Sequence, residues 1–119
     1  MSRHDPGITL RQIVDQACKA QELYSQYTFE SLMADWQKCA AFERVMEVLG
    51  EAVKRLPPAL TARYPAVDWR AIAGMRDRVS HGYDGIDHLL LWQSVETNVP
   101  GLLTTVEQML RDREPPQSK

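Results

Sequence analysis

The chain has 119 residues, enough for one domain with a single core and too few for two. Its 44% hydrophobic and 25% charged residues are ordinary for a globular protein. No apolar run reaches the ~20 residues of a membrane span, and no signal core is visible, so a cytoplasmic protein without membrane contact is expected. A formal net charge of -2 argues against an extensive nucleic-acid-binding surface, although basic residues gather between Lys54 and Arg78.

Five helices and no strand are predicted. The first spans about residues 9–26, because Thr9 and Gln12 have capping-box spacing and apolar residues recur at helical intervals behind them. The second runs without a break over about residues 29–56, with Thr28 as its cap. Residues 1–8 and 114–119 are expected to be flexible ends of the single domain 1–119.

The second helix carries two apolar stripes, one more than a single core-facing seam requires. The additional stripe consists of Met33, Val45, Val48 and Ala52. A helix with so wide an apolar surface is buried on two sides. We infer that the second side meets another copy of the chain; the alternative is burial on three sides within one monomer. Gly50, inside this helix, predicts a close crossing with another helix.

Three shorter helices follow the Pro57-Pro58 break. Asp68 is expected to cap a helix over residues 69–80, Asp87 a helix reaching Val95, and Pro100 to open a last helix to about residue 110. Short connections favour an antiparallel up-and-down bundle. Three tryptophans are interpreted as core anchors and two cysteines as buried free thiols without metal spacing: Trp36, Trp69, Trp92, Cys18 and Cys39.

The segment from Arg76 to Tyr83 carries the residues best suited to chemistry. Asp77 and His81 are four residues apart, so on a helix the carboxylate can orient the imidazole. An arginine fork such as that of Arg76 suits a phosphate, and a histidine can act as general base or acid. With no metal-ligand cluster and no cofactor motif in view, this combination fits metal-free cleavage of an RNA phosphodiester. The alternative is a histidine that merely caps a helix whose Arg-Asp-Arg face is solvated.

Glu51 is a second candidate, because it is an acidic residue on a mostly apolar helix. We expect it to pair with an arginine of the 69–80 helix and so to support the site.

The segment Arg76-Asp77-Arg78-Val79-Ser80-His81-Gly82-Tyr83 resembles the signature of the HepT-like branch of the HEPN ribonucleases. The flanks, from Trp69 to Met75 and from Gly85 to Trp92, are similar as well. Upstream, Phe42-Glu43-Arg44 and Leu49-Gly50-Glu51-Ala52 resemble the family's long-helix motif. The resemblance covers about residues 10–110.

The resemblance implies an all-helical, dimeric, metal-independent RNase toxin, encoded with an MNT-type nucleotidyltransferase antitoxin. Carried over, Arg76 binds the scissile phosphate, His81 is the general acid and base, and Asp77 fills the polar position after the arginine. Tyr83 is the residue to which such an antitoxin can transfer AMP from ATP. RNA is the implied substrate, with no cofactor and no resident metal.

Two positions depart from the family pattern. Ser80 stands where an apolar residue is common, and Asp84 stands where an aromatic residue is common. A carboxylate beside Tyr83 would repel RNA phosphate. The competing function is therefore a non-catalytic HEPN subunit that binds a nucleotidyltransferase without cutting RNA; the acidic net charge favours it, and the intact motif favours the enzyme.

Overall fold

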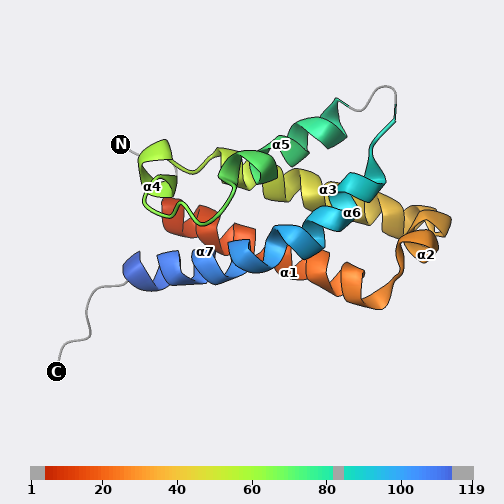
Figure 1. Cartoon of the computed structure of the whole chain (residues 1–119), viewed down its shortest axis with the longest axis horizontal. Coiled ribbons are helices and arrows are strands. Elements are labelled where there is room, and N and C mark those ends of the chain that lie inside the picture. The colour runs from red at the N-terminus through yellow and green to blue at the C-terminus, as the bar shows by residue number, and fades with distance from the viewer. Residues whose placement is uncertain (1–4, 82–84, 114–119) are drawn as a thin grey trace.

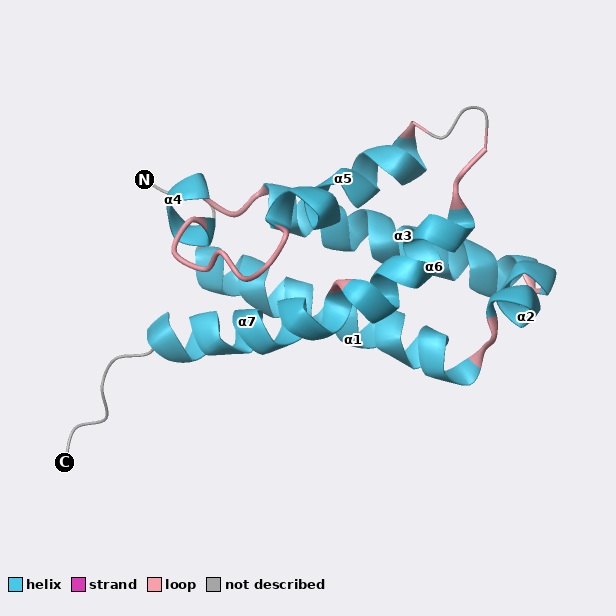
Figure 2. Cartoon of the chain, in the orientation of Figure 1, coloured by secondary structure: helices cyan, strands magenta, loops and turns pink. Residues whose placement is uncertain are grey.

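A computed structural model describes residues 5–81 and 85–113. All regular structure in those two ranges is helical (Figure 2), which confirms the all-α prediction. The helices are α1 (Pro6–Gln26), α2 (Phe29–Ala34), α3 (Trp36–Lys54), α4 (Pro58–Thr61), α5 (Trp69–Ser80), α6 (His88–Thr97) and α7 (Val99–Arg113).

The long helices alternate in direction, as expected for an up-and-down bundle (Figure 1). Helix α3 is central: α5 lies along one side of it and α1 along another, and α7 packs on α1. Its fully buried side chains include Phe42, Met46 and Leu49. Trp92 of α6 closes the core against Phe42, with ring centroids 5.3 Å apart. None of the described helices is both long and apolar enough to cross a lipid bilayer.

The predicted single helix over residues 29–56 is wrong at one point. The chain leaves helical geometry at Asp35 (φ -112°, ψ 96°), where α2 ends and α3 begins. The Asp35 carboxylate accepts a hydrogen bond from the Lys38 backbone N–H at 3.1 Å, so it caps α3. A short polar side chain that captures a backbone N–H competes with helix continuation, and hydrophobic spacing does not record this competition. Thr28 caps α2 as predicted, in a reciprocal pair with Ser31.

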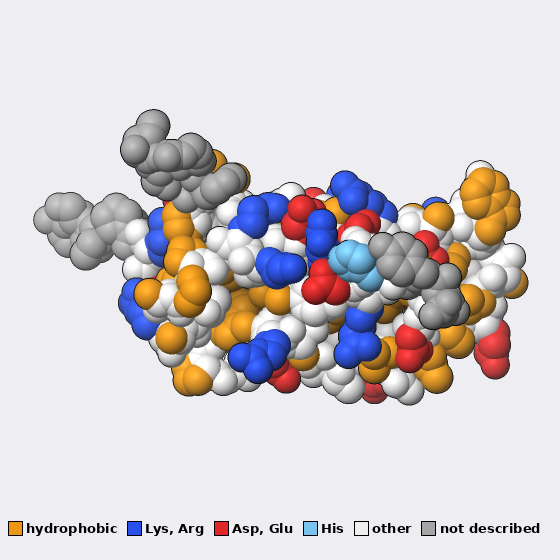
Figure 3. Space-filling view, turned by 90° about the horizontal axis from the view of Figure 1, so that it is seen from above, with side chains coloured by type: hydrophobic (Ala, Val, Ile, Leu, Met, Phe, Trp, Pro, Cys, Tyr) orange, Lys and Arg blue, Asp and Glu red, His pale blue; other side chains and the backbone are white. Residues whose placement is uncertain are grey.

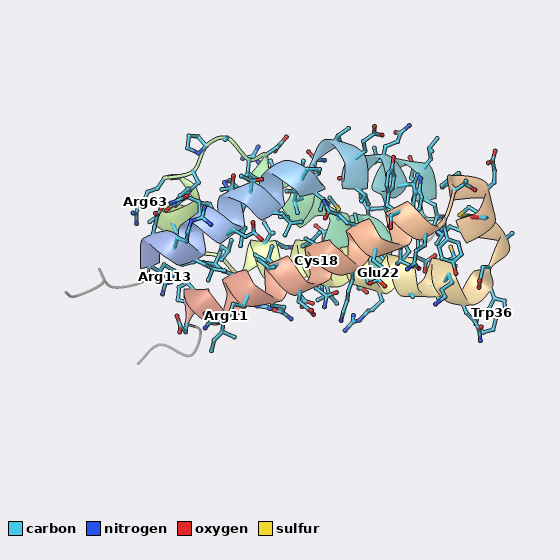
Figure 4. All side chains as sticks on the ribbon, turned by 90° about the horizontal axis from the view of Figure 1, so that it is seen from below. Arg11, Cys18, Glu22, Trp36, Arg63 and Arg113 are labelled. Atoms are coloured by element: carbon cyan, nitrogen blue, oxygen red, sulfur yellow. The ribbon has the colours of Figure 1, made fainter. Side chains whose placement is uncertain are left out.

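The break changes the environment of Trp36. As the first residue of α3 it is 77% exposed and projects at the end of the molecule (Figure 4), so its assignment as a core anchor is wrong. Trp92 is buried as predicted, and Trp69 packs against the core while its indole N–H donates to the Tyr64 carbonyl at 2.9 Å.

The N-terminal boundary also differs from the prediction. Helix α1 begins at Pro6, and Asp5 is its cap, accepting a hydrogen bond from the Gly7 N–H at 2.9 Å. Proline is favoured at the first helical position because its fixed φ suits a helix and its missing N–H is not needed there. Thr9 is buried inside the helix and is not the cap. Residues 6–8, predicted to belong to a flexible end, are therefore helical; residues 1–4 and 114–119 lie outside the described ranges.

The second apolar stripe of the long segment is covered mainly within one chain. Val45 is 9% exposed and Ala52 is fully buried, because α1 and α5 flank α3 on different sides. Val48 is half-buried, and Met33, now on α2, is 41% exposed. The stripe thus fits burial within the monomer, the alternative weighed above, and by itself it no longer argues for a dimer.

Of the two cysteines, only Cys39 is buried as predicted. Cys18 lies on the outer face of α1 and is exposed (Figure 4), so the expectation of two buried thiols is wrong for this residue. Helical spacing placed it next to apolar positions, but none of the described helices covers that face of α1.

Candidate active site

The motif helix α5 is held against α3 by a close backbone approach at Gly50. A β-carbon built there would lie 2.7 Å from the Arg76 backbone N and 2.9 Å from the Ile72 carbonyl oxygen. No side chain fits those distances, so glycine is required for this crossing. The close crossing predicted at Gly50 is confirmed. It fixes how close the backbone of Arg76 lies to α3.

Capping interactions define both ends of α5. The Asp68 carboxylate accepts a hydrogen bond from the Ala71 N–H at 3.1 Å, which confirms the predicted cap. At the other end His81 leaves helical geometry (φ -114°, ψ 25°), and its backbone N–H donates to the Asp77 carbonyl at 2.9 Å. His81 is therefore the C-cap residue, and its backbone is tied to the residue whose side chain it faces.

Three basic groups converge on one carboxylate oxygen, Asp77 Oδ1. Arg76 Nη1 lies 3.6 Å from it, Lys54 Nζ 3.7 Å and His81 Nδ1 3.9 Å. The expected proximity of Asp77 and His81 is confirmed; at 3.9 Å the contact is an ion pair when the imidazole is protonated. Lys54, contributed by α3, was not singled out by motif spacing. We call these four residues the Asp77 cluster.

The Asp77 cluster is open to solvent. The side chains of Arg76, Asp77 and His81 are 37%, 53% and 56% exposed. On the face shown in Figure 3, basic and acidic side chains intermingle around a histidine. An open surface with cationic groups over one carboxylate can accept a phosphodiester from a polymer without a closing lid.

Beside this cluster, Ser80 and Glu47 join α5 to α3. The Ser80 hydroxyl donates to Glu47 Oε2 at 2.5 Å. That hydrogen bond, with further help from Arg44 and Arg76, holds the pKa of the Glu47 carboxyl below its ordinary value despite partial burial. Ser80, which departs from the family pattern, thus has a partner and immediately precedes His81.

From the sequence we expected an arginine of α5 to pair with Glu51, which lies one helical turn beyond Glu47 on α3. Among the described residues Glu51 forms no ion pair, so the predicted pairing with an α5 arginine is not made there. Glu47 is the acidic residue that faces the end of α5. The signal for it was the unusual polarity of Ser80, which needs an acceptor.

Tyr83 lies outside the described residues, as do Gly82 and Asp84. The structure accordingly brings together Arg76, Asp77 and His81 of the predicted site.

Arg78, although in the same motif, faces elsewhere. It lines a pocket of about 210 Å³ between α5 and α6 together with Met75, Leu90, Leu91 and Ser94. Arg76, Asp77 and His81 do not line this pocket. The two arginines of the Arg-Asp-Arg sequence therefore belong to different surfaces of α5.

Metal-ligand side chains meet at a different place, between α3 and α6. In the described ranges Cys39, Glu43 and His88 are the one such group, with ligand atoms within 4.8 Å of one another. The sequence did not reveal it, because His88 is far along the chain and only the bundle brings it to α3.

Over most of its length the chain is similar to proteins that are named as ribonucleases. A family model described as "Ribonuclease HepT-like" matches residues 13–109. A protein of Methanocaldococcus jannaschii, assigned as an RNase, is 32% identical over 114 residues, which cover 96% of this chain and 94% of that protein. A probable ribonuclease HepT of Thermococcus cleftensis is 32% identical, covering 81% and 91% of the two chains. No solved structure matches at a significant level.

Proposed function

The chain belongs to the HepT-like ribonuclease family, and from this membership and the Asp77 cluster we propose that it is a metal-independent endoribonuclease that cleaves RNA with Arg76 and His81. The observation that carries the proposal is the convergence of Arg76 and His81 on the Asp77 carboxylate at 3.6 and 3.9 Å. It puts a phosphate-binding fork and a proton-transfer group within one solvent-accessible patch.

In the proposed reaction the ribose 2′-hydroxyl attacks the neighbouring phosphorus. A base removes the hydroxyl proton, the P–O5′ bond breaks, and an acid protonates the departing 5′-oxygen; the products are a 2′,3′-cyclic phosphate and a 5′-hydroxyl. His81 moves the proton, and Arg76 stabilises the charge that develops on the nonbridging oxygens. Asp77 orients both groups.

One chain offers a single motif histidine, whereas this reaction uses both a base and an acid. A second copy of the chain, facing the first across a twofold axis, would supply the other histidine. We therefore include a homodimer in the proposal. Its support is this chemical requirement and the family resemblance, since the apolar stripe on α3 is covered within the monomer.

The proposal extends to regulation. Expressed alone, the protein would act as a toxin, and an MNT-type nucleotidyltransferase antitoxin would silence it by transferring AMP from ATP to Tyr83. A phosphodiester-linked nucleotide on Tyr83 would add negative charge and bulk two residues along the chain from His81, and negative charge repels RNA phosphate.

The decisive experiment is an RNase assay of purified protein on bulk RNA and tRNA with EDTA present. Wild type is expected to cleave, and His81→Ala and Arg76→Ala to lose about 100-fold or more of the rate. Arg70→Ala is the matched control, because Arg70 is an exposed arginine of the same helix outside the cluster. Absence of cleavage by wild type whose intact mass shows no modification would favour the non-catalytic, nucleotidyltransferase-binding subunit.

Regulation is tested separately with the cognate nucleotidyltransferase and ATP. The wild-type mass should increase by one AMP and cleavage should stop. Tyr83→Phe should remain unmodified and, if it still cleaves RNA, escape silencing. Modification of Tyr83→Phe at another residue would disprove the assignment of Tyr83.

A further inference from the structure

Three side chains with metal-binding atoms converge between α3 and the first residue of α6. His88 Nε2 lies 2.5 Å from Glu43 Oε2, and Cys39 Sγ lies 3.8 Å from the same oxygen. Cys39 and Glu43 are one turn apart on α3, so they project from the same face. Cys39 is 9% exposed, and the side chains of His88 and Glu43 are 17% and 29% exposed, which makes the group half-enclosed but reachable from solvent.

From this geometry we propose that Cys39, Glu43 and His88 form a zinc site, distinct from the Asp77 cluster. A thiolate, an imidazole and a carboxylate are all ligands that Zn²⁺ accepts in tetrahedral sites, with bonds of roughly 2.0–2.3 Å. Two ligand atoms in such a site lie about 3.3–3.7 Å apart. The Glu43–Cys39 separation of 3.8 Å exceeds this range by only about 0.1 Å, and the His88–Glu43 pair would open by about 1 Å.

Zinc binding would release protons from the ligand atoms. Zn²⁺ would displace the proton of the His88–Glu43 hydrogen bond, which would pass to Nδ1 of a neutral His88 or to solvent from a protonated one, and the Cys39 thiol would release its proton to solvent on binding. Three protein ligands leave the fourth tetrahedral position for water. The mixed set of ligands excludes Mg²⁺ and Ca²⁺, which prefer oxygen ligands alone.

The site would connect α3 to α6 without entering the Asp77 cluster. Lys54, the α3 member of that cluster, is eleven residues beyond Glu43, roughly 16 Å along the helix axis. Zinc at Glu43 would anchor His88, the first residue of α6, to α3. The proposal is independent of RNA cleavage, which is assayed in EDTA.

The test uses the untagged full-length chain and two metals, Zn²⁺ and its spectroscopic substitute Co²⁺. Wild type should bind one Co²⁺ per chain with a thiolate-to-cobalt charge-transfer band, and Zn²⁺ should displace it. Cys39→Ser should lose the band, and His88→Gln should bind about 100-fold more weakly or worse. Cys18→Ser is the matched control, since Cys18 is an exposed thiol outside the site, and it should bind as wild type does.

Thermal unfolding gives a second readout, because a ligand that binds only the folded state stabilises it. Zn²⁺ should raise the Tm of wild type and Cys18→Ser but not that of His88→Gln. A cobalt complex without a thiolate band, or one lost in Cys18→Ser and kept in Cys39→Ser, would overturn the site. Should Cys39→Ser fail to fold, the wild-type band and its loss in Glu43→Gln and His88→Gln decide the matter.

Discussion

At the residue scale, the most informative contacts are those that hold the end of α5 in place. The side chain of Ser80, the last residue of α5, donates a hydrogen bond to Glu47. The backbone N–H of the next residue, His81, donates to the Asp77 carbonyl, so both residues at the end of the helix have a defined partner. The backbone of His81 is thereby held at the end of α5, which suits the proton-transfer role proposed for its side chain. In the proposed reaction Glu47 would be a positioning residue for His81, because it hydrogen-bonds Ser80, which immediately precedes His81.

Glu47 gives a prediction about stability and pH. The pKa of its carboxyl is lower in the folded chain than the ordinary value of 4.5, chiefly because Ser80 donates a hydrogen bond to it. A lowered folded-state pKa contributes stability above the unfolded pKa, and that stability is lost as the pH falls through the folded pKa. The difference in unfolding free energy between wild type and Glu47→Gln should therefore be largest near neutral pH and shrink below about pH 4.5.

The measurement is urea unfolding at a series of pH values. Glu107→Gln, which removes a carboxylate from an exposed position of α7, is the control. Ser80→Ala should reduce the effect of Glu47→Gln on the free energy of unfolding, since it removes the hydrogen bond that chiefly lowers the pKa of Glu47. A difference that grows on acidification would contradict the role given to Glu47.

At the element scale, the packing of α5 on α3 places the motif. The crossing depends on Gly50, where the α5 backbone comes too close for any β-carbon. Backbone atoms cannot move aside as the end of a side chain can, so a substitution must separate the two helices. Lys54 would then move away from Asp77, and Glu47 would move away from Ser80.

Gly50→Ala is therefore expected to destabilise the chain by about 1–3 kcal/mol through overpacking. It should also reduce RNA cleavage, because the Asp77 cluster spans the displaced helices. Gly74→Ala is the matched control within α5. Apart from its chain neighbours and the backbone of its own helix, no atom of the described residues lies within 4 Å of the new β-carbon, so this alanine should stabilise the helix by about 0.5–1 kcal/mol. Chemical denaturation and the RNase assay check both; equal effects of the two alanines would show that the crossing is unimportant.

At the scale of the whole molecule, the open question is how many chains make one active site. Val45 and Ala52 are buried within the monomer, so the apolar stripe no longer argues for a dimer. The chemical argument for a dimer is that the proposed RNA cleavage uses both an acid and a base. The proposed pairing of two motifs can be tested without knowing the interface.

Wild type mixed and re-equilibrated with inactive His81→Ala at constant total protein should lose activity with the square of the wild-type fraction. An equal mixture would then keep roughly a quarter of the activity, because only dimers of two wild-type chains are complete. Activity proportional to the wild-type fraction would show that each chain works alone or beside an inactive one. Sedimentation at the assay concentration verifies that the mixed species form.

The sequence by itself determined the helical class, both ends of α5 and the family, whereas it gave five helices in place of the seven in the described ranges and missed α4. Residues three or four apart on a helix share a face whatever surrounds them, so Asp77 and His81 could be paired from spacing alone. Gly50 indicated a helix crossing because glycine inside a helix is costly. Caps such as Thr28 and Asp68 are equally local.

Only the tertiary structure decided which residues meet across helices. Cys18 and Trp36 proved exposed because burial depends on whether another helix covers a face, and spacing along one helix does not contain that information. Glu47, not Glu51, reaches α5 because the helix crossing sets their register. His88 joins Cys39 and Glu43 only through the fold of the bundle, since contacts between residues 45 positions apart leave no periodic trace in the sequence.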